Sequence, residues 1–192
     1  MLTLRPDTSG ARKYLRDLQQ NEIPKVIGRT LNRTASSVKS RASREMRQRV
    51  NLKKAVIDKA IASRRSNEIQ NLAALGLGRA WFEIRYSGKP FGIRDFDARE
   101  TAKGVTFKVA RVGKRRIYTR KGQKGFIVEK FGGNVFARTG VGRQIKKASG
   151  PSIPQFAATK RVQADLIQYA REFWARELER NIQYTISRRR GA

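Results

Sequence analysis

The sequence contains no cysteine and no histidine, and only 15 of its 192 residues are acidic. These absences exclude disulfide frameworks, thiolate and imidazole metal sites, cysteine nucleophiles and Ser-His-Asp triads. No apolar run approaches the roughly 18 residues that a membrane-spanning helix needs, and the first residues lack the apolar core of a signal peptide. We therefore expect a protein that is synthesised in the cytoplasm, does not enter a membrane and uses none of the commonest enzyme chemistries.

Positive charge is what the chain has in excess, because 44 lysines and arginines give a formal net charge of +29 at pH 7. Few soluble proteins tolerate that much self-repulsion without a polyanionic neighbour. The chain also has 39% hydrophobic residues, including nine Phe, five Tyr and two Trp. This composition predicts a folded protein rather than a disordered basic tail.

Residues 1–65 are expected to be helical. A short helix is predicted over 9–21, followed by a longer one over 24–49 in which apolar residues recur every three or four positions. That stripe consists of Ile27, Leu31, Ala35, Val38, Ala42 and Met46. A third helix is predicted after Asn51, a residue type that caps helices well.

Residues 78–148 have apolar residues at every second position in several short runs, separated by turns rich in glycine. This pattern is typical of strands in an antiparallel meander. Three phenylalanines are interpreted as core residues rather than as stacking platforms for bases: Phe82, Phe107 and Phe126. The prolines at 150–154 are expected to prevent a helix there, and a long C-terminal helix is predicted over 158–187.

These elements predict one α+β domain over residues 1–192, with N-terminal helices, a central antiparallel β-sheet meander and a long C-terminal helix. The net charge is +11 over 1–77, +14 over 78–150 and +4 over 151–192. The excess therefore belongs mainly to the helical start and to the sheet.

The densest positive charge lies between Glu100 and Glu129, where nine basic residues occur without an acid. We expect a basic hairpin over 103–124 that meets DNA phosphates or an acidic protein surface, and the alternative is a solvated loop. The residues expected to make such contacts are Arg41, Arg44, Arg47, Lys114, Arg115, Arg116, Arg120, Lys121 and Lys124. No base-reading motif accompanies them, so contact with DNA would be non-specific.

The acidic residues Asp95, Asp97 and Glu100, with Glu83 as a possible neighbour, raise the alternative of a magnesium-dependent nuclease. Arg94 and Arg99 lie among these acids and instead favour a charge-paired loop. We therefore expect a protein that is not an enzyme, with no catalytic residues, no metal site and no cofactor.

Three strings carry a resemblance to a known family: IPKVIGRTLNRTASS at 23–37, KPFGIRDF at 89–96 with GV at 104–105, and GPSIP at 150–154. In their order, and together with the basic character, they resemble the minor tail protein Z family of tailed bacteriophages, whose members are also described as tail completion proteins. The resemblance covers most of the chain.

This resemblance implies a structural virion protein at the head-proximal end of the tail, close to the DNA path, that enables head–tail joining. The implied partners are tail terminator or tail tube proteins, head–tail connector proteins and genomic DNA in the lumen, with a hexameric ring favoured. Assembly would take place in the host cytoplasm. The alternative that the residues alone leave open is a non-specific nucleic-acid-binding protein.

Overall fold

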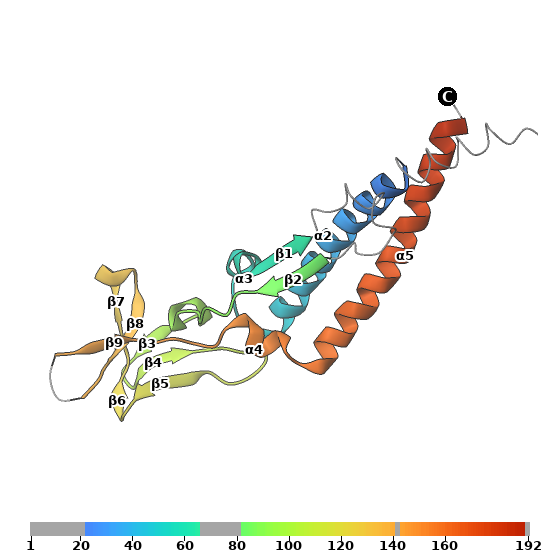
Figure 1. Ribbon diagram of the computed structural model, residues 1–192. Coiled ribbons are helices and arrows are strands. Elements are labelled where there is room, and N and C mark those ends of the chain that lie inside the picture. Colours follow the sequence, from blue (N-terminus) through green and yellow to red (C-terminus); the bar gives the residue numbers. More distant parts are fainter. Residues whose placement is uncertain (1–21, 66–81, 141–142, 191–192) are drawn as a thin grey trace, which may run out of the picture. The chain divides into compact units, whose positions relative to one another are not determined.

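The computed structural model describes residues 22–65, 82–140 and 143–190, and it has the mixed α+β composition that the sequence predicts (Figure 1). The helices are α2 (Ile23–Arg49), α3 (Lys54–Ala60), α4 (Ile153–Ala157) and α5 (Lys160–Arg190), with 3-10 turns η3 (Ile93–Phe96) and η4 (Glu129–Phe131). The strands are β1 (Ile61–Arg65), β2 (Phe82–Tyr86), β3 (Arg99–Thr101), β4 (Gly104–Phe107), β5 (Arg116–Arg120), β6 (Gln123–Lys124), β7 (Phe126–Val128), β8 (Asn134–Arg138) and β9 (Ile145–Lys147). The predicted fold class is confirmed, while the helix predicted over 9–21 lies outside the described residues.

The chain forms two compact units, and each is assembled from segments that are far apart in the sequence. The helix unit takes its described residues from 22–38, 63–65, 82–84 and 167–190. The sheet unit takes them from 39–62, 85–140 and 143–166. Both long helices, α2 and α5, therefore contribute residues to both units.

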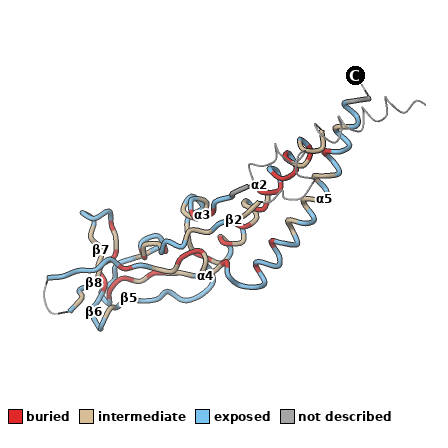
Figure 2. Tube along the Cα trace, viewed as in Figure 1, coloured by how far each residue is buried: buried red, intermediate tan, exposed pale blue. Residues whose placement is uncertain are grey.

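In the helix unit, the buried face of α2 follows the apolar stripe that its sequence predicts, with one change at its start. Leu31, Ala35 and Val38 are buried as expected, but Val26 is buried where Ile27 was predicted, and Ile27 is half-buried. The same face carries two fully buried threonines, Thr30 and Thr34. Figure 2 shows buried positions repeating along one side of α2.

Polar contacts join α2 to α5 inside the helix unit. The Nδ2 of buried Asn181 donates a hydrogen bond of 3.0 Å to Thr30 Oγ1, which in turn donates to the Val26 carbonyl at 2.9 Å. The Ser37 hydroxyl lies 2.7 Å from the Tyr169 hydroxyl. Each of these contacts between the helices joins one particular residue of α2 to one of α5, so together they fix the register of the two helices.

The sheet unit contains two antiparallel sheets, with strand orders β3-β4-β5-β6 and β7-β8-β9. Their apolar side chains surround one core, which consists of Val50, Ile93, Phe96, Val105, Phe107, Val135 and Ala148. Phe107 is buried as predicted, but Phe126 is half-buried, as is Phe82 in the helix unit. The prediction of a core role is therefore confirmed in full only for Phe107.

Two local predictions were wrong. The helical part does not continue to residue 65, because α3 ends at Ala60 and residues 61–65 form β1, which pairs with β2. The GPSIP segment is not free of helix either, because α4 begins at Ile153. Pro154 lies in the first turn of α4. Amide groups in a first turn have no acceptor within the helix, so a proline there costs no helical hydrogen bond.

The basic hairpin predicted over 103–124 is present as β4, β5 and β6. Val105 pairs with Tyr118 in β4 and β5, and Arg120 pairs with Gln123 across the turn into β6. The two residues of that turn, Lys121 and Gly122, have φ values of 48° and 75°. Positive φ at both central positions is the geometry of a type I′ turn, one of the two common turns in two-residue hairpin loops.

Candidate polyanion-binding surface

Most of the excess charge belongs to the sheet unit. Its segments contain 28 of the 44 basic residues and 7 of the 15 acidic ones, so they carry +21 of the chain's net charge of +29. The positive charge predicted for the helical start is therefore divided between the two units, because residues 39–49 of α2 belong to the sheet unit. A polyanion would be attracted to the sheet unit first.

The end of α2 is held against the segment that follows β4. The Asn51 amide donates to the Val109 carbonyl at 2.9 Å, and the Arg111 amide donates to the Arg49 carbonyl at 3.0 Å. The Arg111 guanidinium also donates to the Arg47 carbonyl at 3.1 Å. Arginines distant in sequence are thereby gathered at the C-terminus of a helix, where the helix dipole favours positive charge.

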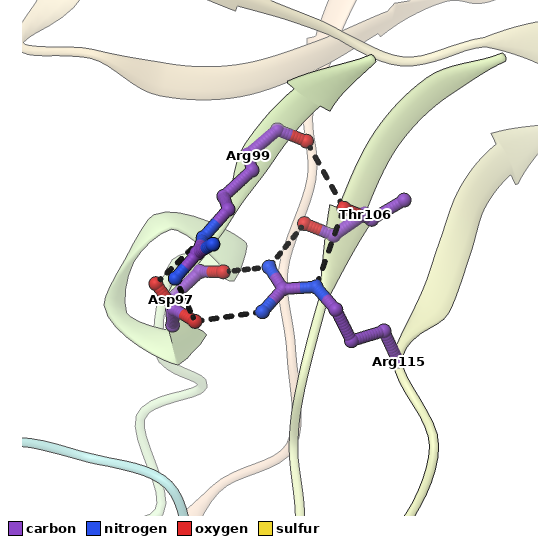
Figure 3. A network of polar contacts seen from close by, with 4 residues as sticks. All are labelled: Asp97, Arg99, Thr106 and Arg115. Carbon is purple, nitrogen blue, oxygen red and sulfur yellow. Dashed lines mark hydrogen bonds and ion pairs between the residues drawn. The ribbon is translucent and has the colours of Figure 1, made fainter.

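Asp97 is the centre of a network of polar contacts that involves the basic hairpin (Figure 3). Its carboxylate accepts from Arg115 Nη1 at 2.7 Å and from Arg99 Nη2 at 3.4 Å. Arg115 Nη2 also donates to the Asp97 carbonyl, and Arg115 Nε donates to Thr106 Oγ1 at 3.4 Å. The hydrogen bond from Arg115, and then the charge of Arg99, hold the pKa of the Asp97 carboxyl below its usual value.

This network changes the interpretation of two predicted features. Arg115 was expected to meet an external polyanion, but the structure directs its guanidinium to Asp97 inside the unit. The alternative to a metal site was a charge-paired acidic loop, and the structure has such a loop, with Arg99 as one of the partners of Asp97. The sequence suggested Arg94 as the other partner, whereas the second cation on Asp97 is Arg115.

The remaining acids of this loop do not converge on a metal-binding geometry. Asp95 Oδ2 accepts a hydrogen bond of 3.1 Å from the Gly92 amide, so it caps the η3 turn. Asp95 and Asp97 both line a pocket of about 500 Å³, but Lys53 and Arg94 line it as well. Across residues 22–65, 82–140 and 143–190, no group of three or more acidic side chains could hold a metal ion.

The hairpin places its other basic residues in two groups at opposite ends of β5. Lys114 and Arg116 lie at its start, while Arg120, Lys121 and Lys124 lie at its end, roughly 13 Å away at the usual rise of a strand. Lys124 Nζ donates to the Ala102 carbonyl at 3.1 Å, and Arg120 Nε is buried without a partner. The remaining three side chains are exposed and have no hydrogen bond or ion pair among the described residues.

The basic residues predicted on α2 also differ from one another. Arg41 Nη2 forms an ion pair of 3.2 Å with Glu45, one helical turn away. Arg44 is exposed, and Arg47 is half-buried with its Nε lacking a partner. Of these three arginines, Arg44 alone is exposed and has no hydrogen bond or ion pair from its side chain among the described residues.

Of the basic residues predicted to contact DNA or an acidic partner, four have exposed side chains without a hydrogen bond or ion pair in the part of the chain that the structure describes: Arg44, Lys114, Arg116 and Lys121. Cations of this kind can attract phosphate or carboxylate groups. None of the helices that the structure describes is long and apolar enough to cross a membrane. Comparisons with protein-family models, curated proteins and solved structures find no match to the chain.

Proposed function

We propose that this protein is a structural component of a bacteriophage tail: a tail completion protein that enables head–tail joining and turns its sheet unit toward DNA or acidic neighbours. The observation that carries the proposal is the net charge of +21 on the sheet unit, combined with exposed cations that no described acid neutralises. Such a surface stabilises an assembly only when a polyanion or an acidic protein lies against it. The family resemblance supplies the place in the virion.

The proposed role is that of one sector in a ring, with a hexamer favoured. Rings form from heterologous contacts that close on themselves, so each sector meets two identical neighbours as well as the proteins above and below. On this proposal the partners are tail terminator or tail tube proteins and head–tail connector proteins, with genomic DNA in the lumen. The role is structural, requires no cofactor and places the protein in the virion at the head-proximal end of the tail.

Loss of the protein from the phage that encodes it tests this proposal. With a nonsense mutation in its gene, we expect electron micrographs to show filled heads and full-length tails that remain separate, and expression of the protein in trans should restore joined particles. Normal joined virions without the protein would overturn the proposal. Tails of abnormal length would indicate an earlier role in tail assembly and would overturn it as well.

A second candidate function, non-specific nucleic-acid binding, is favoured by the exposed cations at both ends of β5. Each phosphate contact contributes a slope of about −0.9 to the dependence of log affinity on log salt for duplex DNA. Reversal of charge by Lys121→Glu should therefore make this slope less steep by about one, while Lys25→Glu, which changes an exposed lysine in the helix unit, serves as the matched control. Affinity that is insensitive to salt would exclude this candidate.

A further inference from the structure

A pocket of about 480 Å³ lies beside the link between β4 and β5 in the sheet unit. Its apolar lining comes from Val109, Ala110 and Val112 of the link, from Pro151, and from Phe156 of α4. Val109 and Phe156 pack against the core of the unit, so this part of the lining has a fixed position. Val112, by contrast, has an apolar side chain and is 86% exposed.

Besides Lys108, four basic residues lie in this link and at the first position of β5, and they divide into two pairs. Arg111 donates to the Arg47 carbonyl, and Arg115 is bound to Asp97, so both are engaged within the unit. The side chains of Lys114 and Arg116 have no hydrogen bond or ion pair among the described residues, and both residues line the pocket. These two cationic side chains thus lie beside the apolar lining without a partner.

We propose that this pocket binds a peptide segment of a partner protein in which an apolar side chain lies next to one or more carboxylates. The apolar side chain enters between Val112 and Phe156, where contact with it removes the exposed surface of Val112 from water. The neighbouring carboxylates pair with Lys114 and Arg116, which fixes the orientation of the segment.

The lining favours such a peptide over a nucleic acid. Phosphate contacts need cations but no apolar floor, and base stacking needs an aromatic face that is open to the ligand. The one aromatic residue here, Phe156, already packs against the core, and the other apolar residues are aliphatic. An apolar side chain matches this lining better than a polar base edge does.

The inference goes beyond the proposed virion role and does not depend on it, because it concerns binding by the purified chain. Fluorescence anisotropy with labelled short peptides provides the test. The main probe contains Leu and Phe flanked by glutamates, one control peptide replaces Leu and Phe by serine, and another replaces the glutamates by glutamine. A single-stranded oligonucleotide of the same net charge as the main probe is the fourth ligand.

We expect the main probe to bind at least about tenfold more tightly than either control peptide, since each control removes one half of the recognition. Val112→Ser and Lys114→Glu should each weaken its binding about tenfold. Lys121→Glu makes the same change of charge at the far end of β5 and should alter binding less than about twofold. Unchanged circular dichroism spectra show that the variants remain folded.

Three results would overturn the inference. The first is equal binding of the main probe and the serine control, which would mean that charge alone is recognised. The second is an equal effect of Lys114→Glu and Lys121→Glu, which would mean that the pocket is not the site. The third is preferential binding of the oligonucleotide that depends on Val112, which would identify a nucleic-acid site instead. None of these results bears on head–tail joining, so the two proposals fail separately.

Discussion

α2 contains two buried threonines, and replacing them one at a time by valine should change the free energy of unfolding in opposite directions. Thr30 and Thr34 lie one helical turn apart, and both side chains are 0% exposed. Thr30 Oγ1 accepts from Asn181 and donates to the Val26 carbonyl, whereas Thr34 Oγ1 has no hydrogen-bond partner among the residues that the structure describes. Valine has nearly the same shape as threonine, so the substitution isolates the contribution of each hydroxyl group.

The expected magnitudes follow from the cost of an unpaired buried polar group, which is about 1–3 kcal/mol. Thr34→Val removes such a group and should raise the free energy of unfolding by about 1–2 kcal/mol. Thr30→Val leaves the buried Asn181 amide without its acceptor and should lower that free energy by about 1–2 kcal/mol. The two variants should therefore differ by roughly 2–4 kcal/mol, or roughly 5–15 °C in Tm for a chain of this size.

Urea unfolding followed by far-ultraviolet circular dichroism measures both variants against the parent protein. Thr30→Ser is the matched control, because it keeps the hydroxyl group and removes only a methyl group, and it should cost less than Thr30→Val. The reasoning would be refuted if both valine variants shifted the midpoint in the same direction. It would also be refuted if Thr30→Ser were the more damaging change.

Other predictions concern the sheet unit. A Cβ at Gly150 would lie 2.5 Å from Phe96 Cε2 in the core, so Gly150→Ala should lower the free energy of unfolding by about 1–3 kcal/mol, as in other overpacked cores. Gly140→Ala, where nothing lies within 4 Å, should change it by less than about 0.5 kcal/mol, and equal thermal shifts would contradict the steric explanation. Because Arg115 and Arg99 lower the pKa of Asp97, the stabilisation from its carboxylate is fully present above the ordinary pKa of about 4 and is lost as pH falls from there through the lowered pKa of the folded protein. The difference in urea midpoint between the parent and Asp97→Asn should therefore shrink steadily as pH falls below about 4, and since Asp97 is exposed it should stay below about 1 kcal/mol at neutral pH. A difference that does not shrink in acid would contradict this assignment.

Periodic patterns in the sequence predicted the fold class and most of its long elements. The stripe on α2 was found because a helix that packs on one side repeats its apolar residues every three or four positions, and Leu31, Ala35 and Val38 do so. The strands were predicted where alternation was regular, and β4 with its buried Phe107 lies within one of those runs. Long-range packing was not needed for either prediction.

Elements that depend on contacts between distant residues were missed. Phe96 is 0% exposed, and its ring packs edge-on against the ring of Phe91, with 6.3 Å between the ring centroids. The acids beside Phe96 in the sequence nevertheless suggested a charge-paired loop. A short 3-10 turn buries such a residue without any periodic pattern that a sequence could show. The helical part expected over 1–65 was likewise overextended, because residues 61–65 form β1, which pairs with β2.

Local charge density identified the basic hairpin as the candidate surface, but it cannot show which of its cations have partners inside the unit. Arg115 bonds to Asp97, which lies 18 residues earlier. Charge density also could not distinguish Arg41, which has an acid one turn away, from the exposed Arg44. Which cations remain available is decided by tertiary contacts, and these also leave Lys114 and Arg116 beside an apolar pocket.

The interleaved construction of the two units has a consequence for synthesis of the chain. Asn181 lies 151 residues after its partner Thr30, so α2 cannot complete its packing until the last part of α5 has left the ribosome. At a translation rate of about 5–20 residues per second, the apolar face of α2 waits roughly 8–30 s for its partner. Over that interval a nascent chain with a strongly positive middle section exposes the apolar face of an amphipathic helix, and we expect chaperones to bind α2 at that face.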